Sequence, residues 1–285
     1  MRVVIDKHAG PCPGVKRAIR MAEENLTESN SLYALGPIIH NELELDRLRK
    51  KGLDVLDQAK IESDNNIEKI RDKKLFIRSH GISPQLQSQL TDNHAQLIDA
   101  TCGKVKRVQN IIQKYYNNGY QVIIAGKKGH PEVVGLSGYC DNKGIVFSDV
   151  SEIDKIDQFK KTVLVSQTTL SRTKFYEIRD RLSSLIENLE IINTICRHIN
   201  RRHEHMARFA GSVDVLLMIG GKKSSNTGVL FDICKTQNSS SYRIESQAEI
   251  DKKWFKTDDL VGITGSASTP VWQLEEVSTF LKSSL

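Results

Sequence analysis

Short apolar runs alternate with amphipathic stretches along the whole chain. In Val105–Asn117 the apolar side chains recur every three or four residues, which is the period of a helix with one buried face. Short apolar runs bounded by turn residues separate such stretches and predict strands. This regular alternation predicts an α/β protein built on parallel sheets.

These two periods define the expected elements. The predicted strands are Arg2–Ile5, Ser31–Leu35, Lys74–Arg78, Gln96–Ile98, Gln121–Ala125, Thr162–Val165, Asp214–Ile219 and Leu260–Thr264. The predicted helices are Val15–Leu26, Asn41–Lys51, Pro84–Thr91, Val105–Asn117, Arg172–Glu187, Arg201–Ala210, Thr227–Thr236 and Pro270–Lys282.

Polar motifs follow the predicted strands directly. In open parallel sheets, ligands bind outside the carboxyl ends of the strands, where such loops lie. The pairs of strand and following motif are SLYAL and GPIIHN, KLFIR and SHG, AQLIDA and TC, YQVIIA and GKKGHPE, TVLV and SQTT, VDVLLMI and GGKKSSN, and LVGIT and GSAS. We therefore expect these motifs to line a ligand cavity.

The bulk composition is that of an ordinary soluble chain. A length of 285 residues suffices for two or three small domains or one large one. Apolar stretches such as Val213–Ile219 are far too short to span a bilayer, and the N-terminal segment reaches charge within six residues. We therefore expect no membrane segment, no signal peptide and a cytoplasmic location.

The formal net charge of +6 is compatible with nucleic acid, an acidic protein or a phosphorylated ligand. The basic residues are spread through the helical stretches and few aromatic residues accompany them, so a stacking platform for single-stranded nucleic acid is not supported. The chain also lacks the GxxxxGK[ST] and GxGxxG signatures of nucleotide sites. We expect no nucleic-acid partner.

Five cysteines in such a chain favour a metal site or a reactive thiol over a disulfide framework. Cys12, Cys102 and Cys196 stand about 90 residues apart, each in a break between an apolar run and a helical stretch. A helix start lowers the pKa of a thiol toward the thiolate that ligates iron or zinc. We expect three similar units that each bring one thiol to a shared centre with one ligand position open. Cys140 and Cys234 are expected to be buried small apolar residues.

The cysteine spacing also sets the expected domain boundaries. They lie near Asp99–Cys102 and Asn193–Cys196, which gives α/β domains at 1–99, 100–194 and 195–285.

Three histidines and one glutamate lie in loops between strands and helices. His40, His80 and His130 stand beside Gly, Pro or Asn, where imidazoles facing one cavity could bind an anion or move protons. Glu132, two residues after His130, could relay a proton. His203 and His205 fall in a charged helical stretch and are expected to be solvated.

Two hydroxyl-rich segments open predicted helices. Ser224, Ser225, Asn226 and Thr227 follow a Gly-Gly turn and two lysines, and their side chains with the free N–H groups of a helix start could cradle an anion. Ser266–Ser268 before Pro270 repeats the pattern. Plain N-capping needs only one of these residues, so two such cradles indicate a phosphate or diphosphate.

The chain resembles the 4-hydroxy-3-methylbut-2-enyl diphosphate reductase family from GPCPGVKRAI to GSASTP. The matching motifs, in the family's order and spacing, are IIHNE, SHGIS, DATC, GHPEVVG, SQTTLS, NTIC, KKSSNT and GSASTP. The resemblance implies three similar α/β domains in a pseudo-threefold arrangement around a central iron–sulfur cluster. It implies that Cys12, Cys102 and Cys196 hold one 4Fe–4S cluster per chain, with one iron open to substrate.

The resemblance also implies the contacts of the substrate and the reaction. The catalytic set would be Glu132, His130 and Thr168, with Thr168 and Glu132 at the allylic hydroxyl and Glu132 in the proton path. The diphosphate would contact His40, His80, His130, Ser224, Ser225, Asn226 and Ser268. The hydroxyl would be removed reductively with two electrons from a ferredoxin or flavodoxin, giving isopentenyl and dimethylallyl diphosphate as the last step of the non-mevalonate isoprenoid pathway. A net positive charge suits such acidic donors.

One local feature departs from the family's pattern, and one stretch stands out by its charge. Pro11 and Pro13 flank Cys12 and stiffen its loop, so we expect an altered entry and a retained ligand. The basic residues Arg197, His198, Arg201 and Arg202 after Cys196 are expected on the docking face of the reductant.

Two other classes of function stay open. A zinc- or cluster-bearing RNA-binding protein would use the thiols structurally, would need no histidine and Ser-Ser-Asn set in these loops, and would lose affinity steeply with salt. A cluster-dependent dehydratase would also need an open iron, but it would need no external electrons.

Overall fold

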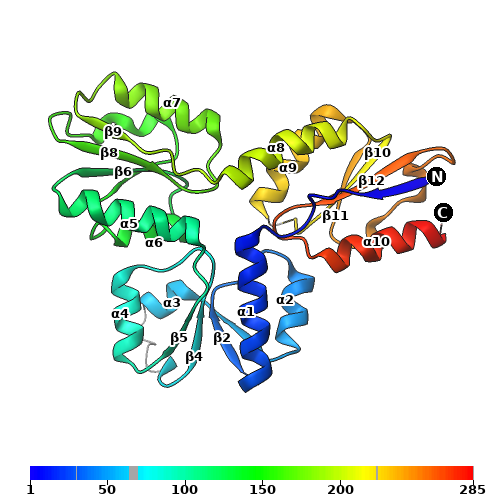
Figure 1. Ribbon diagram of the computed structural model, residues 1–285, viewed down its shortest axis with the longest axis horizontal. Helices are drawn as coiled ribbons and strands as arrows, with labels where there is room; N and C mark the ends of the chain where they lie inside the picture. The colour runs from blue at the N-terminus through cyan, green and yellow to red at the C-terminus, as the bar shows by residue number, and fades with distance from the viewer. Residues whose placement is uncertain (30, 64–69, 223, 285) are drawn as a thin grey trace. The chain divides into compact units, whose positions relative to one another are not determined.

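The computed structural model describes residues 1–29, 31–63, 70–222 and 224–284, which form three four-stranded sheets surrounded by helices (Figure 1). All strand pairs in these sheets are parallel. The α/β class on parallel sheets, predicted from the alternation of periods, is confirmed, and so are the three similar units expected from the cysteine spacing and the family resemblance.

The three sheets share one strand order. The first sheet has the order β3-β2-β4-β5, the second β7-β6-β8-β9 and the third β11-β10-β12-β1. In the first two sheets the chain leaves the two inner strands in opposite directions, which makes a topological switch point between them. In the third sheet β12 is the last strand of the chain, but the helices after β10 and β12, α9 and α10, lie on opposite faces and border the equivalent crevice. The strands are β1 (Arg2–Ile5), β2 (Leu32–Leu35), β3 (Leu53–Leu56), β4 (Lys74–Ile77), β5 (Gln96–Asp99), β6 (Gln121–Ala125), β7 (Ile145–Phe147), β8 (Thr162–Ser166), β9 (Leu189–Ile191), β10 (Val215–Ile219), β11 (Ser241–Ile244) and β12 (Leu260–Gly265).

Helices connect most successive strands. They are α1 (Pro13–Ser29), α2 (Glu42–Arg49), α3 (Gln58–Ser63), α4 (Pro84–Asp92), α5 (Gly103–Asn117), α6 (Pro131–Gly138), α7 (Arg172–Ser183), α8 (Arg197–Ala210), α9 (Ser225–Gln237) and α10 (Val271–Ser284), with short 3₁₀ helices η2 (Val150–Lys155), η3 (Gln247–Glu249) and η4 (Lys252–Trp254). No helix among the described residues is long and apolar enough to cross a membrane.

The chain forms two compact units. Unit 1 comprises Met1–Glu23, Pro37–Gly52 and Arg201–Leu285 and contains the third sheet. Unit 2 comprises Glu24–Gly36 and Leu53–Asn200 and contains the first and second sheets.

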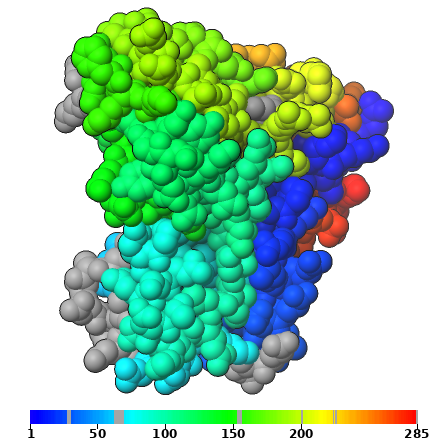
Figure 2. Space-filling model, turned by 60° about the vertical axis from the view of Figure 1, so that its left-hand side comes forward, coloured from blue at the N-terminus to red at the C-terminus, as the bar shows by residue number. Residues whose placement is uncertain are grey.

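Apolar side chains cover both faces of the inner strands. In unit 1, α10 packs on one face of the third sheet and α8 and α9 on the other. In unit 2, α5 and α6 cover one face of the second sheet and α7 the other. Strands β6, β8, β10 and β12 are almost wholly buried, as parallel strands between two layers of helices must be. Within unit 2, α4 contacts α6, and the cyan and green parts of the surface adjoin in Figure 2.

Every predicted strand and helix exists, with ends shifted by a few residues. Strands β3, β7, β9 and β11 and helices α3 and α6 were not predicted. Strand β1 pairs with β12, so the start of the chain completes the sheet built by its last third. The boundaries 1–99, 100–194 and 195–285 stay a prediction, and β1 lies outside the sheet of the first segment.

Candidate active site

The polar motifs lie where the strand pattern predicted them, at the carboxyl ends of the strands. Gly36 directly follows β2 and Arg78 follows β4 in the first sheet, and Gly126 and Gln167 follow β6 and β8 in the second. In the third sheet Ser266 follows β12. Each switch point is thus bordered by residues of the motifs, which makes these edges the candidate site.

Glu132 and Thr168 form a buried pair at the switch point of the second sheet. Only 1 % of Glu132 is exposed. The backbone N–H of Thr168 donates to Glu132 Oε1 at 2.6 Å, and Thr168 Oγ1 donates to Oε2 at 2.9 Å. Burial raises the pKa of Glu132 to about 7, although both hydrogen bonds from Thr168 act in the opposite direction. The carboxyl group therefore exchanges a proton near neutral pH.

The same pair is joined by a hydrogen bond to the predicted ligand Cys196. The backbone N–H of Cys196 donates to the carbonyl oxygen of Thr168 at 2.8 Å. Thr194 fixes this loop to β8, since its Oγ1 donates to the Ser166 carbonyl at 2.6 Å and accepts from the Ser166 N–H at 2.8 Å. Sequence reasoning missed the role of Thr194; its only signal was a threonine two residues before the cysteine.

His130 and His80 come together in unit 2, whereas His40 lies in unit 1, so a single cavity faced by all three histidines stays a prediction. His130 caps the start of α6, and its Nδ1 accepts from the N–H of Glu132 at 3.1 Å. This bond assigns the proton of the neutral imidazole to Nε2. The rings of His80 and His130 lie edge to face with centroids 5.2 Å apart. Two imidazoles and a carboxyl group that titrates near neutral pH thus share one strand-end region.

The packing of α6 makes this approach possible, and its two glycines differ in how tightly they pack. Gly135 packs against the backbone of Gly81 and Ile82, where an added Cβ would meet the Gly81 carbonyl oxygen at 3.6 Å. Gly138 packs much more tightly, and a Cβ there would overlap with the Cβ of Ser83. The close packing of α6 on this segment places His130, at the start of α6, beside His80.

The three predicted cysteine ligands share one structural setting. Cys12, Cys102 and Cys196 directly precede α1, α5 and α8, and all three are partly exposed and outside any disulfide. Cys140 and Cys234 are buried, as predicted, and burial raises the pKa of their thiols to about 11 and about 12.

The shared centre of the three thiols stays a prediction. Cys102 and Cys196 belong to unit 2 and Cys12 to unit 1. Within the described residues, no group of three or more His, Cys, Asp or Glu side chains is gathered as a metal site.

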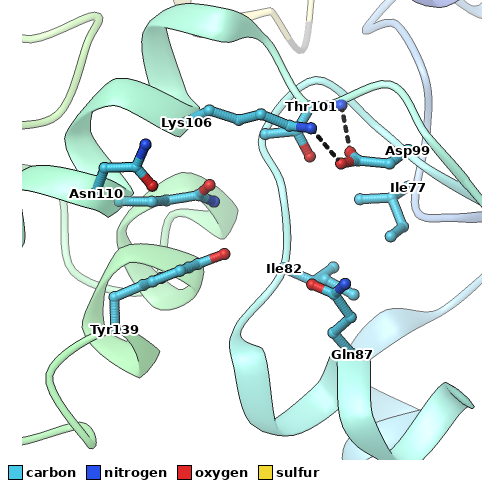
Figure 3. Close-up of a pocket in the computed structure, with 9 residues that line it drawn as sticks. Ile77, Ile82, Gln87, Asp99, Thr101, Lys106, Asn110 and Tyr139 are labelled. Atoms are coloured by element: carbon cyan, nitrogen blue, oxygen red, sulfur yellow. Dashed lines mark hydrogen bonds and ion pairs between the residues drawn. The ribbon is translucent and has the colours of Figure 1, made fainter. Parts of the chain in front are cut away.

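A polar pocket of about 250 Å³ lies beside the loop that leads to Cys102 (Figure 3). Asp99 accepts from the N–H of Thr101 at 2.8 Å and pairs with Lys106 Nζ at 2.6 Å. Burial alone would raise the pKa of Asp99, but these partners hold it below its usual value. Figure 3 shows Gln87 and Tyr139 turned toward the same pocket. The ion pair anchors the loop between β5 and α5 and so positions Cys102.

Buried hydroxyl groups form a network in unit 1. Ser268 Oγ lies 2.8 Å from Ser266 Oγ and 3.3 Å from Ser224 Oγ. Thr227 Oγ1 donates to Ser266 Oγ at 2.8 Å, and Thr269 Oγ1 accepts from the Ser266 N–H at 2.9 Å and donates to the carbonyl oxygen of Ile219 at 2.5 Å. The network joins the two predicted cradles at the third switch point. Thr269 was missed because a hydroxyl after Ser-Ala-Ser gives no signal of its own.

The remaining predicted anion ligands of unit 1 lie near this network. Asn226 is partly exposed in the first turn of α9. His40 lines a cavity of about 520 Å³ together with Gly221 and Lys222, and a Cβ on Gly221 would meet the His40 carbonyl oxygen at 2.9 Å. The side chain of Ser225 lies outside the described part of the structure.

Two surface predictions for α8 are wrong. Arg202 is only 5 % exposed and donates to the carbonyl oxygens of Gly10 and Gly265, so it supports the loop before Cys12 and is not part of a docking face. His205 is not a solvated residue, because its Nε2 lies 2.7 Å from the buried carboxylate of Asp6. The helical period places both residues on the face of α8 that packs toward the sheet. The sequence prediction relied on their charge and therefore placed them on the surface.

Fold and site together define an α/β enzyme with a buried acid at the strand ends and three thiols at helix starts. The family model for the LytB protein matches residues 3–282. Reductases for 4-hydroxy-3-methylbut-2-enyl diphosphate from Caldanaerobacter subterraneus and Chloroherpeton thalassium are 41 % and 37 % identical, each covering 99 % of this chain and 97 % and 96 % of their own lengths.

Solved structures agree with these relatives. A structure of (E)-4-hydroxy-3-methyl-but-2-enyl diphosphate reductase, the terminal enzyme of the non-mevalonate pathway, is 38 % identical, with a TM-score of 0.78 and 99 % of both chains covered. The corresponding reductase of Plasmodium falciparum is 25 % identical, with a TM-score of 0.85 over 99 % of this chain and 88 % of that one. The chain belongs to the LytB protein family and is an oxidoreductase.

Proposed function

We propose that this protein reductively removes the allylic hydroxyl group of 4-hydroxy-3-methylbut-2-enyl diphosphate. The products would be isopentenyl and dimethylallyl diphosphate, at the last step of the non-mevalonate pathway. The observation that carries the proposal is the buried Glu132–Thr168 pair, hydrogen-bonded to the backbone of Cys196, in a chain whose family relatives are named for this substrate.

The three thiols fit an iron–sulfur cluster by their chemistry. Cys12, Cys102 and Cys196 are partly exposed, outside any disulfide and at helix starts, whereas the other two thiols are buried and strongly protonated. We propose that they hold one 4Fe–4S cluster per chain. Once bound, the cluster would pass the two electrons of an external donor to the substrate and would supply the Lewis acidity of an open iron.

The residues of the second sheet supply the proton. Breaking the C–O bond with two electrons requires one proton for the departing oxygen, which leaves as water, and one for the allylic carbon skeleton. Glu132 holds a proton over much of the neutral range because its pKa is about 7. Its carboxyl group is fixed by two hydrogen bonds from Thr168, so the proton is held at a defined place. We propose that Glu132 passes a proton to the departing oxygen. Thr168 would orient the carboxyl group, and His130 would be the next group in the proton path.

The diphosphate would be held by imidazoles, hydroxyls and helix starts. In unit 2 these are His80 and His130, whose rings are in contact. In unit 1 they are His40, Ser224, Ser225, Asn226 and Ser268, at the start of α9 and around the hydroxyl network. Such groups bind phosphate oxygens through N–H and O–H donors and the positive end of the helix dipole.

The electron donor would be an acidic ferredoxin or flavodoxin. Lys7 and Lys16 are exposed and lie within five residues of Cys12, and Arg201 is exposed at the start of α8 in unit 1. Positive charge around an electron entry point would steer an acidic carrier toward it.

Turnover with a chemical electron donor tests the proposal. Glu132→Gln keeps the shape of the side chain and one acceptor oxygen for the Thr168 N–H, but its amide cannot give up a proton, so we expect full iron content and at least a roughly hundredfold loss of turnover. Glu177→Gln, an exposed position on α7, is the matched control and should leave turnover unchanged. Near-normal turnover of Glu132→Gln with a full cluster would remove Glu132 from the proton path.

The same assay separates the competing classes. Consumption of an allylic alcohol substrate without any reductant would indicate a dehydratase. Salt-sensitive binding of RNA with no reductase turnover would indicate an RNA-binding protein.

A further inference from the structure

Arg78 is a buried cation that the proposed reaction has not used. It follows β4 and is only 5 % exposed. Within the described part of the chain no hydrogen bond or ion pair reaches its guanidinium group, and the Nε atom is wholly buried without a partner. A buried charge without a partner costs several kcal/mol, so such a group is retained where a ligand can pair with it.

The guanidinium group lies flat over the backbone of Gly36. A Cβ built on Gly36 would lie 2.6, 2.7 and 2.8 Å from Arg78 Cζ, Nη1 and Nη2, so all three atoms face it at nearly the same distance. Gly36 also has a φ of +82°, which glycine adopts without strain. The glycine after β2 therefore makes room for the arginine after β4.

This position is the switch point of the first sheet. Strands β2 and β4 are the inner neighbours in the order β3-β2-β4-β5, and the chain leaves them in opposite directions. Ligands of open α/β sheets bind in the crevice at this point. In the other two sheets the same place holds the Glu132–Thr168 pair and the hydroxyl network, so Arg78 is the charged group of the third equivalent position.

Arg78 is connected through the backbone to both neighbouring site loops. Its carbonyl oxygen accepts from the N–H of Gly81, which closes the turn that carries His80. The carbonyl oxygen of the next residue, Ser79, accepts from the N–H of Cys102 at 3.0 Å. Burial lowers the pKa of Arg78 to about 10, so the group stays positively charged at neutral pH.

We propose that Arg78 is an oxyanion-binding residue at the switch point of the first sheet and contacts the diphosphate group of the ligand. A guanidinium group offers paired N–H donors that match two phosphate oxygens, and no described residue of the chain pairs with those of Arg78. The inference deepens the proposed function, on which it rests for the identity of the ligand.

Direct binding of inorganic diphosphate to the cluster-loaded protein tests this assignment. By isothermal titration calorimetry, Arg78→Met should lower the affinity at least about tenfold, because hydrogen bonds to charged groups are strong. Arg78→Lys keeps the positive charge but loses the paired N–H donors, so its affinity for diphosphate should lie between those of Arg78→Met and the parent. Arg107→Met removes one exposed positive charge from the same unit and should stay within about twofold of the parent.

A thermal unfolding measurement separates binding from structural support. Removal of an unpaired buried charge should leave ligand-free Arg78→Met at least as stable as the parent, while diphosphate should raise the melting temperature of the parent much more than that of the variant. A destabilised variant, a loss of iron, or an unchanged diphosphate affinity would each overturn the proposal. Binding of inorganic diphosphate does not require turnover. If the parent lacked reductase activity, the proposed function would fail while the diphosphate titration still tested Arg78.

Discussion

At the scale of single residues, the state of Glu132 links folding to pH. Its usual pKa is 4.5 and burial raises it to about 7 in the folded chain. Between these values the folded state binds more protons than the unfolded state, so the free energy of unfolding falls as pH rises. The contribution is present below pH 4.5 and is lost as pH passes through about 7.

The stability of the folded chain should therefore depend on the ionisation of Glu132. Replacing Glu132 with Gln removes the dependence, so the stability of the parent relative to Glu132→Gln should fall by about 3 kcal/mol between pH 4.5 and pH 7.5. Urea unfolding at several pH values, on samples with matched iron content, measures the difference. The control Glu177→Gln should track the parent, and parallel curves for parent and Glu132→Gln would mean that the pKa of Glu132 is the same in the folded and the unfolded chain.

A second prediction concerns the hydroxyl group of Thr168. Thr168→Val removes one donor to the carboxylate but leaves the backbone N–H, so the charged form of Glu132 loses stabilisation and its pKa rises by about one unit. The limb of the pH profile of kcat/KM that reports this group should shift upward accordingly. Thr168→Ser keeps the donor and should not shift the limb; a shift of equal size in both variants would point to packing instead.

At the scale of elements, the packing of α6 decides how the histidines meet. Gly138 packs tightly against Ser83, and this packing brings the start of α6 close to His80. At Gly135, in contrast, there is room for a methyl group. Neither glycine was recognised from the sequence, because α6 has too few turns to show a helical period and its GHPEVVG motif predicted a loop.

Matched alanine substitutions test this arrangement. Gly138→Ala should cost about 1–3 kcal/mol of stability and weaken diphosphate binding, because its Cβ forces α6 away from Ser83. Gly135→Ala should be neutral or stabilising by up to about 1 kcal/mol, through helix propensity. Differential scanning calorimetry and diphosphate titration compare the two, and equal effects of both alanines would contradict the packing argument.

The strands missed from the sequence show what a pattern can reveal. All four, β3, β7, β9 and β11, lie at the edges of their sheets. An inner parallel strand is covered on both faces and reads as a continuous apolar run, as in β10, whereas an edge strand such as β11 has polar positions and only partial burial. The sequence therefore reveals the inner strands and their loops, which carry the site, better than the outline of each sheet.

At the scale of the whole molecule, three sheets of one strand order are built from a chain whose first strand completes its last sheet. The cysteine spacing revealed the repetition because each thiol lies between an edge strand of its sheet, β1, β5 or β9, and the helix that follows it. It could not reveal that β1 pairs with β12, since four residues of half-exposed edge strand fit any of the sheets equally well. Pairing over more than 250 residues depends on tertiary contacts that local patterns do not encode.

The last prediction uses this repetition. If the three equivalent thiols hold one cluster, Cys12→Ser, Cys102→Ser and Cys196→Ser should each lose most of the bound iron, because a cluster with two protein ligands is poorly held. Cys140→Ser and Cys234→Ser are the internal controls, since burial raises the pKa of both thiols and neither residue directly precedes a helix. Iron and sulfide analysis of protein purified without oxygen measures the result. Equal loss in all five variants would show that iron retention reports folding alone, whereas loss confined to two of the first three would assign the remaining cysteine a different role.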